Sequence, residues 1–313
     1  MGMKDLVEGA RRHAGVTVPA ITVAGLRKSY GSTEAVKGIS FEVAEGEVFA
    51  LLGPNGAGKT TTVEILEGYR GRDGGTVSVL GMDPERGGSR LRERIGIVLQ
   101  ECGIEELLTV GEVVTRQSGY YRAPRPVEEV IDLVGLADRT GARVRTLSGG
   151  QRRRLDLALA LVGDPELVFL DEPTTGFDPA ARRNAWDLVK TLCRLGKTVF
   201  LTTHYMEEAQ YLADRVAVIA GGRLVAEGPP ASIAGRDTDS ARIRFTLPGG
   251  LALSAVPVDA RLEDGQALIE TPDPTRALHT LTGWALERGV ELRDLTVSRR
   301  SLEDVYLDLV GRA

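Results

Sequence analysis

The sequence predicts an α/β fold in which helices cover a largely parallel β-sheet. Nearly continuous apolar runs, among them EVFALLG, LVFLDE and TVFLTTH, alternate with helical stretches from Ala20 onward. A run that is apolar at successive positions is typical of a strand buried on both faces. The alternation of such strands with helices favours crossover connections and parallel pairing. The length of 313 residues allows one large domain or two.

The strand candidates follow one another in a regular order. The β-type runs ITVAGL and ISFEV come first, and EVFALLG precedes a glycine-rich turn and a helix. After this helix, the runs TVSVLG, IGIVLQ, LVFLDE, TVFLTTH and VAVIA alternate with helical stretches. The AGGR step at 220–223, which follows VAVI, predicts a tight hairpin.

Two regions depart from this alternation. Residues 108–146 contain two helical patterns separated by Pro124 and Pro126, which predicts a helical insertion within the α/β core. Residues 227–240 are rich in Pro, Gly, Asp and Ser, which indicates a boundary. We therefore expect three parts: a flexible leader over 1–19, a core domain over 20–233 that includes the insertion, and a small α+β module over 237–313.

Composition restricts the class of protein. A net charge of −5 gives no basic footprint, so no nucleic-acid partner is expected. The two cysteines, Cys102 and Cys193, are too few for a disulfide framework and predict a reduced, cytoplasmic protein. No stretch approaches the roughly 18 consecutive apolar residues of a membrane span, so any membrane role is expected to come through a partner. The basic run 152–154 is interpreted as a solvated helix face.

The segment GPNGAGKTT, from Gly53 to Thr61, fits the pattern G-x-x-x-x-G-K-[ST] between a strand and a helix. Its three glycines allow the backbone to bend tightly and direct N–H groups at phosphate oxygens. We expect Lys59 to reach the β- and γ-phosphates of a nucleotide, and the Thr60 hydroxyl to bind Mg²⁺. The segment therefore predicts a nucleotide triphosphate site.

A second apolar strand, LVFLDE, ends in two carboxylates. Asp171 stands at the strand end, where it can contribute to a Mg²⁺ shell, and the adjacent Glu172 can point towards an attacking water. Many strands end in acids, so the pair alone is a weak indication. Together with the glycine-rich loop it completes the set that phosphoryl transfer to water needs, which is a metal, a charge clamp and a base.

Three further residues have both a functional and a structural interpretation. His204 ends the strand TVFLTTH, at the sheet edge where ligands bind, so it can contact a γ-phosphate. Gln100 ends IGIVLQ in the same way and can touch Mg²⁺ or water, and Tyr30 can stack on an adenine ring. Taken singly, each of the three is more often an ordinary structural residue.

The stretch LSGGQ at 147–151 raises the question of a second anion-binding turn. Ser148, Gly149, Gly150 and Gln151 begin a helix and can present backbone N–H groups to a phosphate. The chain already has one phosphate loop far upstream, so a second turn of this kind within one domain needs a reason.

Taken in order, these motifs resemble those of the ATPase subunit of ATP-binding-cassette (ABC) transporters. LSGGQ is close to diagnostic of that family, whereas the phosphate loop alone is shared by many NTPases. The resemblance covers roughly residues 20–233, and Phe177 departs from it slightly because Leu is more usual there. The matched positions are Tyr30, the Walker A loop (Gly53, Pro54, Asn55, Gly56, Ala57, Gly58, Lys59, Thr60 and Thr61), the Q-loop Gln100, the signature Ser148, Gly149, Gly150 and Gln151, the Walker B Asp171 and Glu172, the D-loop Asp178 and the switch His204.

The resemblance implies a P-loop NTPase fold with an antiparallel β subdomain beside the parallel sheet and the helical insertion. It implies ATP and Mg²⁺ as cofactors, with Glu172, His204 and Lys59 as catalytic residues and Thr60, Gln100 and Asp171 as the metal shell. It also implies a head-to-tail dimer with a second copy or a paralogue, in which each signature turn covers the ATP of the other subunit. A separate membrane permease would then hold the cytoplasmic subunit at the inner face of the membrane.

Within that family the chain looks most similar to drug-efflux ATPases of the daunorubicin-resistance type, through GIEELLTVGE, QRRRLDLALALVGDPEL and SLEDVYLDLVG. The expected function is therefore ATP hydrolysis that powers export of a drug-like or lipid-like substrate through the permease. Two alternatives are a soluble ABC ATPase acting on nucleic acid or ribosomes, and the ATPase subunit of an importer. For the C-terminal module, dimer stabilisation or permease docking is the simpler interpretation, and a regulatory ligand site is the alternative.

Overall fold

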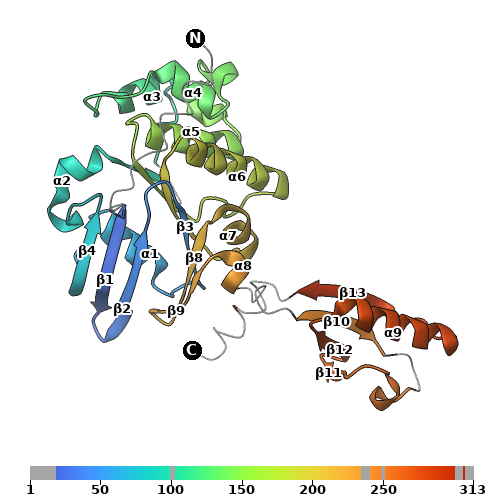
Figure 1. Ribbon diagram of the computed structural model, residues 1–313. Helices are drawn as coiled ribbons and strands as arrows, with labels where there is room; N and C mark the ends of the chain where they lie inside the picture. Colours follow the sequence, from blue (N-terminus) through green and yellow to red (C-terminus); the bar gives the residue numbers. More distant parts are fainter. Residues whose placement is uncertain (1–18, 99–102, 234–239, 248–250, 300–305, 307–313) are drawn as a thin grey trace, which may run out of the picture. The chain divides into compact units, whose positions relative to one another are not determined.

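The computed structural model describes residues 19–98, 103–233, 240–247, 251–299 and 306. The chain divides into two compact units, Met1–Val225 and Ala226–Ala313 (Figure 1). The domain limits expected at residues 19, 233 and 237 stay predictions. Among the described residues, no helix combines the length and the apolar character that a membrane crossing requires.

A six-stranded sheet forms the centre of the first unit, and its order confirms the α/β prediction. The sheet is parallel from β5 through β8, because β5–β6, β6–β7, β7–β3 and β3–β8 all pair in the parallel sense. β9 follows β8 across a hairpin in which Gly221 and Gly222 have positive φ. The strands in spatial order are β5 (Ile95–Val98), β6 (Leu167–Asp171), β7 (Thr198–Thr203), β3 (Val48–Leu52), β8 (Arg215–Ala220) and β9 (Arg223–Gly228).

This sheet is buried because its strands are apolar on both faces. Every residue of β3 and of β7 is buried. Four phenylalanines lie against one another with ring centroids 5.3 to 6.0 Å apart: Phe41, Phe49, Phe169 and Phe200. Burial of each such ring contributes about 2 kcal/mol, so this cluster is a large part of the core that fixes the strand ends.

A second, antiparallel sheet lies in the same unit. It contains β2 (Thr33–Val43), β1 (Ile21–Tyr30) and β4 (Gly74–Val79), in that order. The TVSVLG run thus forms β4 beside β1 instead of joining the parallel sheet. Figure 1 shows the three strands together at one side of this unit, next to α1.

Helices surround the two sheets. α3 and α4 lie where two insertion helices are predicted, each shorter than its sequence pattern, and both pack against α5 (Figure 1). Thr109 and Glu112 cap α3 reciprocally, which explains where it begins. The helices of the first unit are α1 (Lys59–Leu66), α2 (Pro84–Arg92), α3 (Val110–Ser118), α4 (Val127–Leu133), η2 (Ala137–Arg139), η3 (Val144–Thr146), α5 (Gly149–Leu161), α6 (Pro179–Arg194) and α7 (Met206–Leu212), while α8 (Pro230–Ile233) falls within the second unit.

The second unit is a small α+β structure with its own core. Its antiparallel sheet has the order β11 (Arg261–Glu263), β12 (Gln266–Thr271), β10 (Ala241–Thr246) and β13 (Arg293–Arg299). α9 (Pro274–Glu287) contributes Leu281 and Trp284 to a core shared with Phe245 of β10, and η4 (Leu253–Ala255) packs at its margin. The SLEDVYLDLVG segment at 301–311, for which the sequence predicts a helix, falls outside the described residues except for Tyr306.

Candidate active site

The phosphate loop, the acidic pair and His204 converge at the carboxyl ends of β3, β6 and β7. The phosphate loop follows β3, Asp171 and Glu172 follow one another at the end of β6, and His204 follows β7. The parallel register pairs Leu52 with Thr203 and Asp171 with Thr202, so these strand ends lie level with one another. Residues more than 100 positions apart in the sequence therefore meet at one edge of the sheet.

The phosphate loop depends on glycine at positions where the chain approaches itself closely. A Cβ at Gly53 would lie 2.4 Å from the Ile219 carbonyl oxygen, and one at Gly58 would lie 2.6 Å from the Ala35 carbonyl oxygen. Gly58 also has a φ of 104° and caps α1 without a side-chain hydrogen bond to its first turn. The N–H groups of that turn are therefore available to an anion.

Lys59 is buried beneath this loop, with 5% of its surface exposed. Its Nζ donates to the carbonyl oxygens of Gly53, at 2.8 Å, and Pro54, at 3.3 Å, and lies 3.3 Å from Glu172 Oε1. The same ammonium lines a cavity of about 340 Å³, which is bounded by Ala35, Asn55, Gly56, Gly58, Lys59, Thr60, Thr61 and Glu172. A cation held in this way can pair with a phosphate that enters the cavity.

Glu172 occupies a strained backbone conformation. Its φ is +44°, which is unusual for a residue other than glycine and costs about 1–3 kcal/mol. Its N–H donates to both the carbonyl oxygen and the hydroxyl of Thr202, at 3.2 and 3.1 Å. Its carboxylate lies 3.2 Å from His204 Nδ1 and accepts a 3.1 Å hydrogen bond from the Thr175 hydroxyl. The strain is thus held in place by contacts from two neighbouring segments.

The two adjacent carboxyls, Asp171 and Glu172, have pKa values shifted in opposite directions. Burial by itself raises the pKa of Glu172, but the hydrogen bond from His204 and the charge of Lys59 outweigh it and hold the pKa below its usual value. Burial raises the pKa of Asp171 despite the 2.5 Å hydrogen bond that the Thr202 hydroxyl donates to its Oδ1. Glu172 is therefore ionised at neutral pH and able to accept a proton from water.

The oxygen donors at this edge fit a magnesium ion. Thr60 offers a hydroxyl beside the cavity and Asp171 offers a carboxylate at the end of β6, which are the hard donors that Mg²⁺ prefers. Within the described ranges, no group of three or more His, Cys, Asp and Glu side chains could hold a metal alone. Mg²⁺ commonly keeps waters and phosphate oxygens, so two protein donors suffice. Gln100, the third expected ligand, lies outside the described residues.

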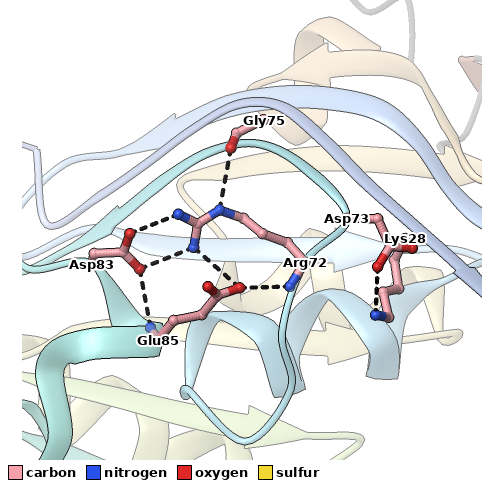
Figure 2. Close-up of polar contacts among 6 residues, drawn as sticks. All are labelled: Lys28, Arg72, Asp73, Gly75, Asp83 and Glu85. Carbon is pink, nitrogen blue, oxygen red and sulfur yellow. Dashed lines mark hydrogen bonds and ion pairs between the residues drawn. The ribbon is translucent and has the colours of Figure 1, made fainter.

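Tyr30 ends β1 with 42% of its surface exposed, so its ring is open to stacking. The Arg70 guanidinium lies 5.1 Å and the Lys28 ammonium 5.9 Å from the ring centroid. Lys28 is in turn held by a 2.8 Å ion pair with Asp73 (Figure 2). These contacts surround the ring that the sequence predicts to stack on an adenine.

The segment that supplies Asp73 is itself anchored by Arg72, as Figure 2 shows. The Arg72 guanidinium forms a bidentate pair with Asp83 at 2.9 and 2.6 Å and also donates to the Gly75 carbonyl oxygen. Its backbone N–H donates to Glu85 Oε1 at 2.7 Å. Asp83 also caps α2, so one side-chain cluster ties the start of that helix to the turn before β4.

The signature turn is closed on itself. Ser148 Oγ accepts from the Gln151 N–H at 3.3 Å, and Gln151 Oε1 accepts from the Ser148 N–H at 3.0 Å, so the pair forms a capping box at the start of α5. Gly149 and Gly150 have no positive φ, and a Cβ on either would meet nothing within 4 Å. These residues lie apart from the phosphate cavity, and Ser148, Gly150 and Gln151 line another of about 290 Å³ between α5 and α6.

The interpretation of 152–154 as a solvated helix face is wrong for Arg153. Only 13% of its side chain is exposed, and its Nε donates to the Pro173 carbonyl oxygen at 3.2 Å. This contact joins α5 to the loop that follows Glu172. Asp178, at the far end of that loop, caps α6 by accepting from the Ala181 N–H at 2.8 Å.

Sequence patterns missed two residues that support the site. Thr202 bonds both Asp171 and Glu172, and it stands inside the TTH motif without being singled out there. Glu208 lies four residues after His204 and is completely buried. A charged residue on the inward face of a short helix is not distinguishable from a surface residue until the packing of α7 is known.

The fold and the site together define an ATP-binding cassette. A family model described as "ABC transporter" matches residues 36–175. A second model, described as "ABC transporter domain-containing protein-like, C-terminal domain", matches residues 241–301. The cbiO1 structure from Clostridium perfringens, part of the ABC transporter complex cbiONQ, has a TM-score of 0.64 at 29% identity and covers 70% of this chain and 92% of that one. A cassette solved as a post-hydrolysis dimer with ADP and Pi has a TM-score of 0.59 at 26% identity, with coverages of 67% and 98%.

Relatives along almost the whole chain define the family further. A daunorubicin resistance ATP-binding protein of Streptomyces coeruleorubidus is 39% identical over 308 residues, which cover 93% of this chain and 96% of the relative. A Nod factor export ATP-binding protein of Rhizobium sp. strain N33 is 42% identical over 303 residues, with coverages of 94% and 97%. The chain belongs to the ABC transporter family of ATP-binding proteins and is an ATPase.

Proposed function

We propose that this chain is the ATP-hydrolysing subunit of an ABC exporter. The observation that carries the catalytic part is the contact of Lys59, Glu172 and His204 at a cavity bounded by the phosphate loop. The names of the relatives, which refer to daunorubicin resistance and to Nod factor export, support export over import and over a role on nucleic acid. Both names also favour a drug-like or lipid-like substrate.

In this proposal the phosphate loop and Lys59 bind the ATP phosphates, and Tyr30 stacks on the adenine. Thr60, Asp171 and Gln100 would hold Mg²⁺, which would neutralise charge on the phosphates. The phosphate loop and the buried Lys59 support phosphate binding because they line the same cavity. Removal of the Lys59 ammonium therefore weakens ATP binding.

Glu172 acts as the general base of hydrolysis. Its carboxylate is kept ionised by His204 and Lys59, and it lines the cavity where a water would attack. His204 orients this carboxylate through the 3.2 Å contact of its Nδ1, and we propose that it also contacts the γ-phosphate. The Thr175 hydroxyl donates a hydrogen bond to Glu172 Oε2, the same oxygen that lies next to His204 Nδ1.

The signature turn, residues 147–151, acts in trans. Its glycines are not needed by the fold of their own chain, and its residues lie apart from the phosphate cavity of that chain. Both facts are expected if the turn faces ATP held by a second subunit, which is a copy of this chain or a paralogue. Hydrolysis then requires a head-to-tail dimer, and Asp178 lies at the junction where the two subunits meet.

A separate permease completes the transporter. The helical insertion, residues 108–146, is the surface proposed to contact it at the inner face of the membrane, and ATP-driven closing of the dimer would move it. Cells that express the chain with its permease partner would show ATP-dependent efflux, and the same cells carrying Glu172→Gln would not. Uptake of substrate in place of efflux would contradict the exporter assignment.

The sharpest test of the ATPase assignment is Glu172→Gln in the purified full chain. The variant is expected to bind ATP while phosphate release falls by about 100-fold or more, because the water loses its base. Glu166→Gln is the matched control, since Glu166 stands just before the other end of β6 in an ion pair with Arg94. Wild-type turnover in Glu172→Gln would remove this residue from the catalytic role.

A further inference from the structure

Glu208 lies on the inward face of α7, behind the active site. Its side chain is 0% exposed, although carboxylates are seldom fully buried unless they have partners. Burial raises its pKa, and hydrogen bonds from Thr174 and Trp186 act in the opposite direction. A buried acid surrounded by donors from separate elements has a defined geometric role in its fold.

The hydrogen bonds of Glu208 come from two separate segments. Its Oε1 accepts from the Thr174 hydroxyl at 2.8 Å and from the Trp186 Nε1 at 3.0 Å. Thr174 belongs to the loop after β6, and Trp186 belongs to α6. Glu208 itself lies on α7, which begins two residues after His204. One side chain thus joins the loop after β6 and α6 to the helix that follows His204.

The joined segments lie close in sequence to the catalytic pair. Thr174 is two residues after Glu172, and Glu208 is four residues after His204. Glu172 and His204 meet at 3.2 Å on the cavity side. Glu208 therefore joins the two segments that carry Glu172 and His204, on the side away from the cavity.

Stacking contacts reinforce the same arrangement. The Trp186 ring lies 4.9 Å from the Tyr211 ring, so α6 and α7 are also joined beyond the carboxylate. The Arg182 guanidinium of α6 lies 4.4 Å from the ring of Tyr205, which follows His204. Rigid packing around Glu208 means that a displacement of α6 or of the loop after β6 is transmitted to His204.

We infer that Glu208 is a positioning residue for hydrolysis: by bonding Thr174 and Trp186 from the helix that follows His204, it sets the separation of Glu172 and His204 and couples it to α6. This inference rests on the proposed roles of Glu172 and His204. It goes beyond them because Glu208 is completely buried, does not line the phosphate cavity, and acts only through the segments that it joins.

The test uses Glu208→Gln and Thr174→Val in the full chain, singly and together. Each single variant should lower kcat by about 10- to 100-fold, because displacements of about 1 Å at reacting groups have such effects. The dissociation constant for ATP should stay within about twofold of the wild type, since the phosphate loop is not touched. The kcat of the double variant should lie within about twofold of the kcat of the slower single variant, since both changes break one network.

Glu47→Gln is the matched control. Glu47 is also a buried glutamate, it bonds Arg215 at 3.2 Å, and it precedes β3 at the opposite end of the sheet from the phosphate loop. Its variant should lose thermal stability but keep kcat. An equal loss of kcat in Glu47→Gln would show a general stability effect and overturn the inference.

Three other outcomes overturn it as well. They are a kcat within about twofold of the wild type in Glu208→Gln, an ATP affinity that falls in proportion to kcat, and additive losses in the double variant. Failure of the proposed function is distinguishable, because it would appear as normal turnover in Glu172→Gln whatever Glu208→Gln does.

Discussion

The phosphate loop and the signature turn are similar in sequence and differ in what their glycines do. Both are glycine-rich turns that begin a helix. Gly53 and Gly58 face backbone oxygens so closely that any side chain would clash with the chain itself. Gly149 and Gly150 face nothing within 4 Å and have ordinary backbone angles. The first turn needs glycine to fold, and the second does not.

The helix starts show the same difference. The first turn of α1 has no side-chain cap, which leaves its N–H groups to an anion in its own cavity. The first turn of α5 is capped by Ser148 and Gln151. In the proposed dimer, the glycines of the signature turn keep a space clear for the ATP of the partner. A motif can thus be specified by a neighbour that its own chain does not contain.

The largest expected effect is on folding, in Gly58→Ala. The Cβ would meet the Ala35 carbonyl oxygen at 2.6 Å, at a φ of 104°. We expect a loss of about 3 kcal/mol or more in the free energy of unfolding, measured by urea denaturation. Gly56→Ala is the control, because Gly56 has a φ of 80° with nothing within 4 Å, so it bears backbone strain of only about 1–2 kcal/mol. Equal losses would contradict the role of close approach.

A second effect concerns Glu67, which directly follows α1. Burial, with the nearby charges of Asp171 and Glu64, raises the pKa of Glu67 to about 8. Between its usual pKa and about 8 the folded protein holds a proton that the unfolded chain has lost, so stability falls as pH rises through this window. Glu67→Gln should remove this loss, which is about 5 kcal/mol at most.

Unfolding at pH 5 and pH 8 would measure it. The stability difference between the two pH values should be smaller in Glu67→Gln than in the wild type. If the stability difference were the same in Glu67→Gln and in the wild type, the ionisation of Glu67 would not contribute to the pH dependence of stability.

The smallest effect on stability is expected in Gly150→Ala, although its effect on function is large. Alanine favours the helix, so the free energy of unfolding should stay unchanged or rise by up to about 1 kcal/mol. ATP affinity of one subunit should not change. Hydrolysis in the dimer should fall by about 100-fold, because the methyl group enters the space proposed for the ATP of the partner.

Gly283→Ala provides the matched control for this variant. Gly283 also lies in a helix, α9, with nothing within 4 Å, but in the second unit. It should show the same small change in stability with wild-type turnover. If Gly150→Ala hydrolysed ATP normally, the signature turn would not face a second nucleotide.

Local motifs explain how much could be predicted from the sequence. The phosphate loop, Asp171, Glu172 and His204 follow apolar strands directly, and parallel pairing brings strand ends together, so their convergence was predictable. The sheet to which β4 belongs was not, since an apolar run does not specify its neighbour.

The contacts made by helix faces also could not be predicted from the sequence. Arg153 and Glu208 look like surface residues in any pattern, and only the packing of α5 and α7 shows that both are enclosed. Thr202 acts through two hydroxyl contacts to residues about 30 positions away. Such roles depend on tertiary register, which propensity and periodicity do not determine.

The hydrogen bond from Arg153 to the Pro173 carbonyl oxygen has a consequence for the timing of hydrolysis. In the proposed dimer, the start of α5 faces the ATP of one site, while Arg153 on the same helix holds the residue after Glu172 in the other site. A change at the first nucleotide therefore reaches the base of the second through a single side chain. The two sites of such a dimer would be coupled, so that ATP hydrolysis at one site would alter the rate of hydrolysis at the other.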